Sequence, residues 1–180
     1  MSSSFSVRNL ILALVVVVLS ASLYWGFQSQ NRDTSLEAQA QQSLPLEEAL
    51  GNGKPTLTEF YAHWCRSCQA MAPAIASLKK EYGSQINFVM LNVDNRKWLP
   101  EVLRYRVDGI PHFVFSDSTG QAIAEAIGEL PTTVMRANLQ ALVAQEPLPY
   151  ASSQGQTSPL DTAETVASPL EPRSHGQPIL

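Results

Sequence analysis

The sequence predicts an α/β fold, a mixed β-sheet flanked by helices, with one transmembrane helix in front of it. Three observations carry this prediction. Residues 56–94 follow the order strand, helix, strand, which is that of a parallel βαβ unit. Residues 112–127 read as two strands around a turn at 117–120, the pattern of an antiparallel hairpin. Residues 10–27 are apolar and carry no charge, as a membrane span requires.

The apolar stretch 10–27 is long enough to cross a bilayer. At a helical rise of 1.5 Å per residue it reaches about 27 Å, close to the thickness of the hydrocarbon layer. Tyr24, Trp25 and Phe27 gather at one end, as aromatic residues do at a membrane interface. Two interpretations stay open: an uncleaved signal anchor in contact with lipid, and a signal peptide cleaved at the small residues 20–22. The apolar run continues past that point, which favours the anchor.

The positive charges on either side of this stretch indicate its orientation. Arg8 and the N-terminus lie in the short segment 1–9 before it, and Arg32 follows it, an asymmetry of about one charge. This favours an N-terminus on the inside and a following domain across the membrane. Residues 28–44 are polar and rich in Gln, without a sustained apolar period, so we expect a linker.

One domain is expected over residues 45–145. Its elements in chain order are a helical turn at 46–50, a strand at 56–61, a helix to about 82, a strand at 86–94, a helix at 97–106, strands at 112–115 and 121–127, and a helix at 131–145. The strands are rich in β-branched and aromatic residues, and Gly, Asn, Asp and Ser punctuate the turns between them. The first long helix contains Pro73, which removes one backbone hydrogen bond.

The helices are predicted from apolar side chains three and four residues apart. The side chains expected to face the core are Met71, Ile75 and Leu78 in the first long helix, Trp98, Val102 and Leu103 in the next, and Met135, Leu139, Leu142 and Val143 in the last. After the last helix, residues 146–180 carry prolines among Ser, Gln and Thr, with few large apolar side chains. Such a segment buries too little surface to offset the entropy of ordering, so we expect a disordered tail.

The two cysteines of the chain, Cys65 and Cys68, stand where the strand ends and the helix begins. The unpaired N–H groups and the dipole of a helix start stabilise a thiolate and lower its pKa, and Arg66 adds a positive charge. We expect Cys65 to be the exposed nucleophile and Cys68, one turn into the helix, to be the more buried resolving thiol. A pair at this spacing closes a disulfide with little backbone movement, which suits reversible exchange.

Other interpretations of the cysteine pair are weaker. Half of a zinc site needs two further ligands, and His63, His112 and His175 show no paired ligand spacing, so no metal is expected. A purely structural disulfide that closes so short a loop would stabilise the chain little. The chain carries no flavin or nicotinamide motif, so no cofactor is expected beyond the redox-active disulfide. The net charge of −4, without a Lys/Arg cluster, argues against a nucleic-acid partner.

Several motifs together resemble the thioredoxin family. Residues 62–68, followed by 71–73, resemble its active-site turn, and residues 107–111 resemble the segment that holds its cis-proline. Residues 91–94 are similar to its central strand, and Gly128 to the glycine before its last helix. The resemblance covers about half of the chain. With the apolar stretch, the whole chain is most similar to the membrane-anchored thioredoxin-like proteins of cyanobacteria and chloroplast thylakoids.

The resemblance implies a substrate-binding surface beside the disulfide. It implies a cis peptide bond before Pro111, for which an ordinary trans turn is the alternative. The backbone of Ile110 would then lie against the disulfide, where a substrate strand can pair with it. Trp64, just before the first cysteine, would offer the partner a flat contact face.

The resemblance also implies residues that tune the sulfurs. Glu59 occupies the position of a buried aspartate, where a raised pKa would let it relay a proton to the resolving thiol; the alternative is an edge carboxylate in solvent. The lysine that the family often has nearby is Met90 here. His63 and His112 would flank the sulfurs, and either one, when protonated, would stabilise the thiolate; the alternative is a plain surface histidine.

These expectations combine into a membrane-anchored thiol–disulfide oxidoreductase, a protein-disulfide reductase acting through Cys65 and Cys68 on proteins of the thylakoid lumen or periplasm. The resemblance implies a membrane thiol-transport protein of the cytochrome c biogenesis type as electron donor. It implies apocytochrome c and other lumenal disulfides as substrates, and a role in assembling the photosynthetic electron-transport chain. Two alternatives stay open: a tethered thiol oxidase, since Arg66 favours a more oxidising couple, and a non-catalytic binding or chaperone module.

Overall fold

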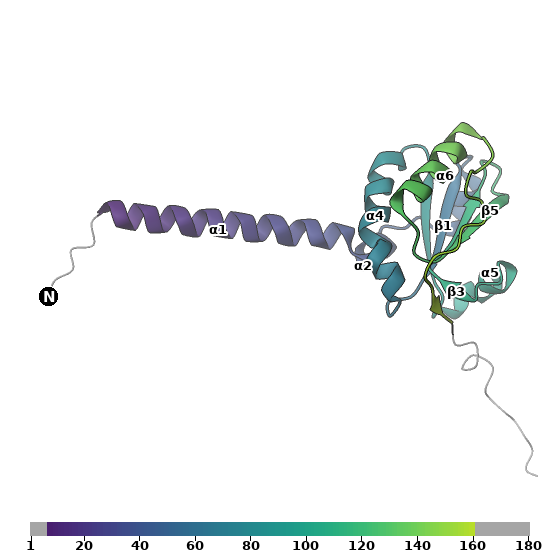
Figure 1. Ribbon diagram of the computed structural model, residues 1–180, viewed down its shortest axis with the longest axis horizontal. Helices are drawn as coiled ribbons and strands as arrows, with labels where there is room; N and C mark the ends of the chain where they lie inside the picture. The colour runs from purple at the N-terminus through teal and green to yellow at the C-terminus, as the bar shows by residue number, and fades with distance from the viewer. Residues whose placement is uncertain (1–6, 161–180) are drawn as a thin grey trace, which may run out of the picture.

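Strand β1 (Thr56–Tyr61) lies inside a four-stranded sheet of order β2-β1-β4-β5. The computed structural model describes residues 7–160. Strand β2 (Asn87–Asn92) runs parallel to β1, which makes the predicted βαβ unit. Strands β4 (His112–Ser116) and β5 (Ala122–Ile127) are antiparallel neighbours and form the predicted hairpin. The sheet is therefore mixed, as the sequence predicts (Figure 1).

Helices α4 (Arg66–Tyr82) and α6 (Thr132–Ala144) cover one face of this sheet. Their apolar sides meet Leu57 of β1 and the phenylalanines of β4 in one buried cluster. The two helices contribute Met71, Ile75, Leu78, Tyr82, Met135, Leu139 and Leu142 to it. The three- and four-residue spacing that predicts these helices is thus the spacing of their buried side chains.

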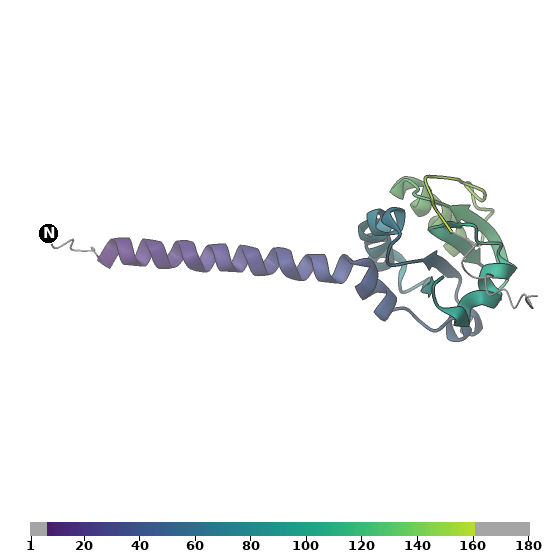
Figure 2. The same cartoon turned by 90° about the horizontal axis from the view of Figure 1, so that it is seen from below.

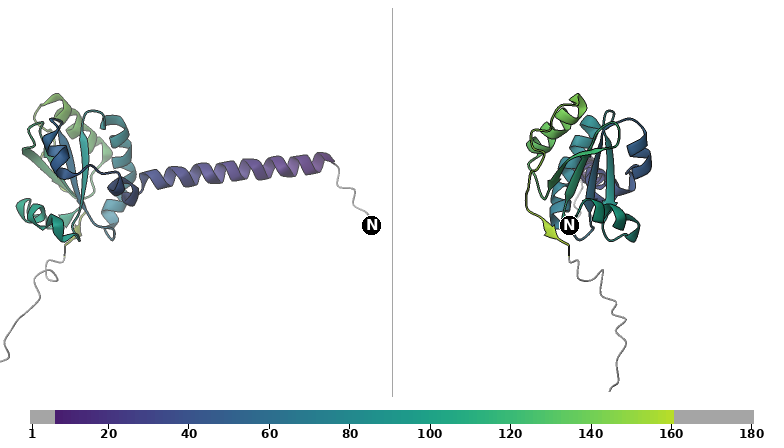
Figure 3. Two further views of the ribbon diagram at one scale, coloured as in Figure 1. Left: turned by 180° about the vertical axis from the view of Figure 1, so that it is seen from behind. Right: turned by 90° about the vertical axis from the view of Figure 1, so that its right-hand side faces the viewer.

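The opposite face is covered by α3 (Leu46–Gly51), the 3-10 turn η1 (Arg96–Trp98) and α5 (Leu99–Arg104), which Figure 3 shows from behind. Phe60 of β1 is fully buried on this side. It belongs to a second cluster that includes Ala49 of α3, and side chains of η1 and α5 pack against that cluster. The fold class predicted from the sequence is therefore confirmed on both faces.

One inward side chain is predicted wrongly. Leu103 is 68% exposed, whereas Val102 beside it is half-buried against the second cluster. Neighbouring residues in a helix point about 100° apart, because a turn takes 3.6 residues. A short helix that turns Val102 toward the sheet therefore turns Leu103 to solvent.

Helix α1 (Val7–Thr34) precedes the domain and extends away from it (Figure 2). Over Val7–Gly26 its mean hydropathy is 2.1 and none of it is buried. Among the described residues it is the one helix long and apolar enough to cross a membrane. A helix that is apolar on all sides and exposes those side chains is consistent with a single-pass membrane protein.

The expected linker 28–44 is not a free linker, so this prediction is wrong. Helix α1 continues to Thr34, and a second short helix, α2 (Leu36–Gln41), follows at once. Ser35 caps α2, because its hydroxyl accepts the N–H of Ala38 at 3.2 Å. One of the polar residues in this stretch therefore caps a helix, which the average composition of the segment does not indicate.

Side-chain hydrogen bonds hold this segment on the domain. Leu36 and Gln39 of α2 are buried. Gln39 Nε2 donates to the carbonyl of Ala72 in α4 at 2.8 Å, and the hydroxyl of Ser43 accepts the N–H of Met90 at 2.8 Å. The two buried residues of α2 are one leucine and one glutamine, so they do not form a repeating apolar pattern. The sequence therefore does not predict that this segment packs on the domain.

Residues 146–160, which we call the C-terminal strap, lie on the domain, and the prediction of a disordered tail is wrong for them. The strap runs along β5 and ends in β6 (Ser158–Pro159), which pairs antiparallel with β3 (Gly109–Ile110), as Figure 1 shows. The remaining residues of the predicted tail, 161–180, lie outside the described residues.

Hydrogen bonds to backbone groups hold most of the strap, and Leu148 and Leu160 add apolar contacts. Strand β5 is an edge strand of the sheet, and its free backbone groups accept a neighbour. Ile127 N–H in β5 donates to the carbonyl of Ser153 at 2.9 Å. Asn138 of α6 is fully buried and bonds both backbone groups of Tyr150, at 3.1 and 2.9 Å. Composition does not predict these bonds, because the strap makes them with backbone groups, which every sequence carries.

Candidate active site

Cys65 and Cys68 form a disulfide at the point where β1 gives way to α4. Cys65 is the N-cap residue of α4, and the backbone N–H of Cys68 donates to its Sγ at 3.0 Å. The sulfur thus takes the position of a capping oxygen at the positive end of the helix dipole. Arg66, the first residue of α4, is exposed beside it. This is the local geometry that the sequence predicts.

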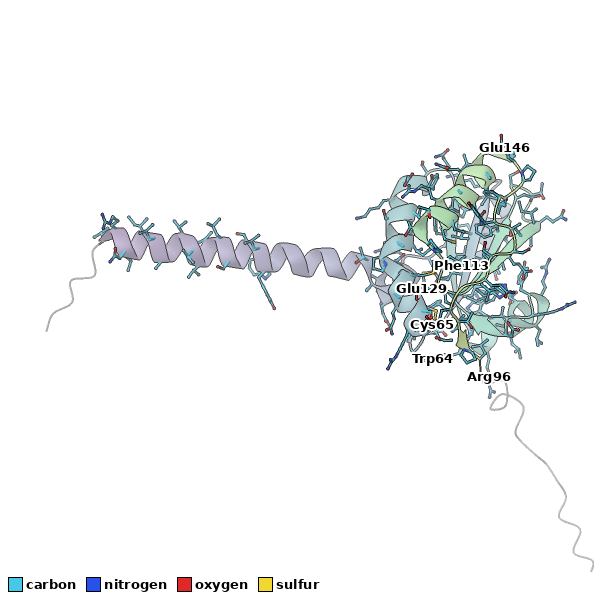
Figure 4. All side chains as sticks on the ribbon, viewed as in Figure 1. Trp64, Cys65, Arg96, Phe113, Glu129 and Glu146 are labelled. Atoms are coloured by element: carbon cyan, nitrogen blue, oxygen red, sulfur yellow. A yellow bond between two sulfur atoms is a disulfide. The ribbon has the colours of Figure 1, made fainter. Side chains whose placement is uncertain are left out.

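Both cysteines are fully buried, with 0% of their surface exposed in the disulfide form. The expectation of an exposed Cys65 and a more buried Cys68 is therefore wrong for this state. Both belong to the second buried cluster together with Ile110, and Leu160 of the strap packs against that cluster. The cover comes from segments remote in sequence, so the residues around the cysteines do not reveal it. Figure 4 shows Cys65 and Trp64 at the end of the domain where the strap finishes.

The peptide bond between Ile110 and Pro111 is cis, as the resemblance implies. Ile110 is fully buried in the cluster that holds the two sulfurs. The carbonyl of Pro111 accepts the N–H of Gly128 at 2.7 Å, and Gly128 has a φ of 88°, which favours glycine. These contacts fix the proline segment beside the disulfide.

Trp64 is 50% exposed just before the disulfide. Its Nε1 donates to the carboxylate of Asp94, with the two oxygens at 3.2 and 3.3 Å. Gln69 Nε2 donates to the carbonyl of His63 at 2.6 Å, which ties the turn to the first turns of α4. Sequence reasoning missed Asp94. A usable signal existed, since Asp94 follows β2 and parallel strands end at the same edge of a sheet.

Glu59 of β1 is buried, with 3% of its surface exposed, so the alternative of a solvent-facing carboxylate is wrong. Burial raises the pKa of Glu59 from 4.5 to about 8, because the charged form loses its hydration. Its Oε1 has no hydrogen-bond partner among residues 7–160. The carboxyl is therefore protonated at neutral pH.

A small cavity of about 10 Å³ borders Glu59. This is room for about one water molecule. Gln39 of α2 lines the cavity, and its Oε1, like that of Glu59, is buried without a partner in the described part of the chain. Met90 and Lys79 also line it, and burial lowers the pKa of Lys79. The sequence predicted neither Gln39 nor Lys79 at this position, because both approach from helices rather than from β1 or β2.

The two predicted histidines have different environments. His63 is about half exposed, and its Nδ1 lies 3.0 Å from Glu37 Oε1 of α2. His112 is buried, and its Nε2 lies 3.1 Å from Glu125 Oε2 of β5. Burial lowers the pKa of His112, although the carboxylates of Glu125 and Asp108 oppose the shift. The imidazole of His112 is therefore neutral near pH 7 and does not supply the positive charge expected of it.

These features together suit thiol–disulfide exchange. A sulfur caps a helix start, a second sulfur lies one turn further on, and a buried strand edge passes beside both. Within residues 7–160, no group of three His, Cys, Asp or Glu side chains lies close enough to hold a metal ion. The chemistry that the arrangement supports is that of the two sulfurs.

Comparisons with known proteins agree with this geometry. The family model for thioredoxin matches residues 38–141. Over 172 residues, 96% of both chains, the sequence is 63% identical to the thiol:disulfide interchange protein TxlA homolog of Synechocystis sp.. It is 47% identical over 170 residues to the thiol:disulfide interchange protein TxlA of Synechococcus elongatus, covering 93% of this chain and 89% of that protein. It is 42% identical over 167 residues to the chloroplastic thioredoxin-like protein HCF164 of Arabidopsis thaliana, covering 91% of this chain and 62% of that protein.

Proposed function

Because the chain belongs to the thioredoxin family, it is a thiol–disulfide oxidoreductase, and we propose that it reduces disulfides of extracytoplasmic proteins from a membrane anchor. The observation that carries the proposal is the disulfide itself, a cysteine pair at the start of α4 facing the cis-proline segment. Thioredoxin-fold proteins act through such a pair without a cofactor. The electrons therefore come to the sulfurs from another protein.

The reaction proceeds in two exchange steps. In the reduced chain, the Cys65 thiolate attacks one sulfur of a substrate disulfide; a new S–S bond forms, the substrate S–S bond breaks, and one substrate thiolate leaves. The Cys68 thiolate then attacks Cys65 Sγ and releases the second substrate thiolate. The substrate gains two electrons and, after protonation, two protons, and the chain ends as the disulfide seen here.

The helix start makes the first step fast. The N–H of Cys68, which donates to Cys65 Sγ in the disulfide form, is aimed at the position where a thiolate charge develops. The exposed guanidinium of Arg66 adds to this positive potential. Both effects favour the ionised form of Cys65 over the thiol and make it the nucleophile.

Glu59 is the proposed proton carrier for the resolving thiol. A pKa of about 8 keeps its carboxyl protonated at neutral pH and close enough to the working pH to exchange a proton. The cavity that Gln39 and Glu59 border has room for about one water molecule, to which the carboxyl would pass that proton. Glu59 thus takes the part that a buried aspartate plays in the family.

Substrate proteins are proposed to bind over Trp64 and along the backbone of Ile110, beside Pro111. The indole of Trp64 is half exposed and oriented by Asp94, so it offers a fixed flat surface. The backbone of Ile110 offers hydrogen bonds to an extended chain.

The membrane part of the proposal rests on α1. We propose that α1 is an uncleaved anchor in contact with lipid, and that the domain faces the thylakoid lumen or periplasm. The exposed apolar surface of Val7–Gly26 and the positions of Arg8 and Arg32 support this. A membrane thiol-transport protein would then supply electrons, and apocytochrome c would be one substrate, with a role in cytochrome assembly.

Trapping of substrates tests the proposed activity. In a Cys68→Ser variant the mixed disulfide cannot be resolved, so substrate proteins should stay attached to Cys65 and separate on reducing gels. The matched control is Cys65→Ser, which keeps one thiol but lacks the nucleophile and should trap nothing. If neither variant traps a protein through a disulfide, the chain is a binding module instead. The reduction potential then fixes the direction: a value near about −270 mV is that of a reductase, and one near about −120 mV that of an oxidase.

A further inference from the structure

The C-terminal strap ends on the backbone edge beside the disulfide. Its strand β6 pairs antiparallel with β3, with Ser158 opposite Ile110. Leu160 N–H then donates to the carbonyl of Asp108 at 3.1 Å. Ile110 precedes the cis bond and shares a buried cluster with both cysteines, against which the side chain of Leu160 packs. The end of the strap therefore lies where an extended chain would lie to present a disulfide to Cys65.

We propose that residues 156–160 of the strap are an internal occupant of the substrate-binding edge, and that a substrate protein binds by displacing them. The proposal rests on the proposed function, since the edge matters only if a substrate disulfide must reach Cys65. The side of a strand edge pairs with one chain at a time, so strap and substrate exclude each other. The complete burial of Cys65 shows that some cover must move before another protein's sulfur can touch it.

The strap is held firmly at its base and lightly at its end. At the base, the buried side chain of Asn138 forms hydrogen bonds with both backbone groups of Tyr150. Leu148 packs against the buried cluster between the sheet and helices α4 and α6. At the end, none of the residues 151–160 is buried, and β6 has two residues. Few buried contacts mean that the end can open locally while the base stays attached.

Between base and end, the strap crosses the loop before α6 through a close backbone contact. Gly155 N–H donates to the carbonyl of Ile127 at 2.7 Å, and Glu129 N–H donates to the carbonyl of Gln156 at 2.8 Å. A Cβ on Gly155 would overlap the backbone carbonyl of Glu129. Backbone atoms cannot rotate away as a side chain can, so a methyl group here must lift the strap. Figure 4 shows Glu129 at the same end of the domain as Cys65.

This arrangement defines the kind of partner that the site accepts. A substrate must offer an extended segment with free backbone groups, and that segment must pair with Ile110 better than Ser158 does. A disulfide inside a compact region without such a segment does not displace the strap. The strap is therefore a specificity-determining part of the site. It also weakens binding of every substrate, because the apparent Kd equals the intrinsic Kd divided by the fraction of molecules in which the strap is open.

The test compares Gly155→Ala with the wild type in the full chain, kept in detergent micelles. The matched control is Gly51→Ala, because a Cβ on Gly51 meets nothing within 4 Å. Three quantities are measured: the alkylation rate of the reduced protein with iodoacetamide, KM and kcat for insulin reduction with dithiothreitol as the electron source, and hydrogen exchange at the amides of Glu129 and Leu160.

In Gly155→Ala we expect both amides to exchange rapidly, alkylation to speed up about tenfold, and KM for insulin to fall about tenfold with kcat unchanged. A peptide with the sequence of residues 153–160 should then inhibit Gly155→Ala competitively. Gly51→Ala should match the wild type in all respects.

Rapid amide exchange with wild-type alkylation and KM would overturn the proposal, because the strap would then be released without effect. Protected amides in Gly155→Ala would also overturn it, since a strap seated as described cannot accommodate the methyl group. Failure of the peptide to inhibit would contradict the shared edge. If alkylation speeds up but neither protein reduces insulin, the strap is as proposed and the reductase function is wrong.

Discussion

Replacing Glu59 by glutamine is expected to remove a large pH dependence of the stability of the domain. The pKa of Glu59 is 4.5 in an exposed chain and about 8 in the fold, where burial penalises the charge. Below pH 4.5 the carboxyl is protonated in both the folded and the unfolded chain, so stability does not depend on pH through Glu59. Between pH 4.5 and about 8 the unfolded chain releases the proton while the fold keeps it, so stability falls as pH rises. Above about 8 both release it and the loss levels off.

The size of this effect follows from the interval between the two pKa values. Each pH unit corresponds to about 1.4 kcal/mol of unfolding free energy. From pH 4.5 to 7 the Glu59 term therefore costs the wild type about 3 kcal/mol, and the full interval to about 8 costs about 5 kcal/mol. Glutamine keeps the shape of the side chain and does not ionise. Any hydrogen bond it leaves unmade shifts its stability by the same amount at every pH.

The assay is urea unfolding of the oxidised full chain in detergent micelles, at several pH values from 4.5 to 8.5. We expect the free energy of unfolding of Glu59→Gln, relative to wild type, to rise by about 1.4 kcal/mol per pH unit between pH 4.5 and about 8, and to level off above that. Glu48→Gln, an exposed carboxylate of α3, is the control and should run parallel to the wild type. Parallel curves for Glu59→Gln and the wild type would mean that Glu59 ionises normally, and the buried proton carrier would be refuted.

Three further variants test the contacts around the site. Gln39→Ala removes the hydrogen bond from α2 to the carbonyl of Ala72, and should lower the unfolding free energy by about 1–3 kcal/mol in the same urea assay. Asp94→Ala frees the indole of Trp64, so KM for protein substrates should rise several-fold with kcat nearly constant, whereas an unchanged KM would remove Trp64 from the binding surface. His112→Gln should leave the pH profile of insulin reduction unchanged near pH 7, because the imidazole is already neutral there; a shifted profile would show that it carries charge.

The sequence predicts most of the central domain, because its elements carry their own periodic signal. The strand 56–61 is found at the predicted residues, and α4 and α6 bury the apolar positions that predict them. The cysteine pair is predicted with its local geometry, since a strand end and a helix start fix it. The cis bond before Pro111 follows from family resemblance, since its local sequence is that of an ordinary turn.

The parts that the sequence does not predict depend on contacts between distant residues. Ser158 lies opposite Ile110, and a two-residue strand has too short a pattern to indicate a partner. Gln39 is buried because its amide meets a carbonyl of α4, although its type is mostly found at the surface. The burial of Cys65 and of His112 likewise depends on which segments fold over them. Local pattern thus predicts the elements, whereas the cover of the site has to be seen in the structure.

The acidity of Cys65 is the property on which the proposed chemistry depends. It is measured as the rate of iodoacetamide alkylation of the reduced Cys68→Ser variant between pH 4 and 10, since only the thiolate reacts. The helix start and Arg66 predict a midpoint well below the pKa of an ordinary cysteine. A midpoint near about 8.5, the value of an ordinary cysteine, would show that the start of α4 does not activate this sulfur.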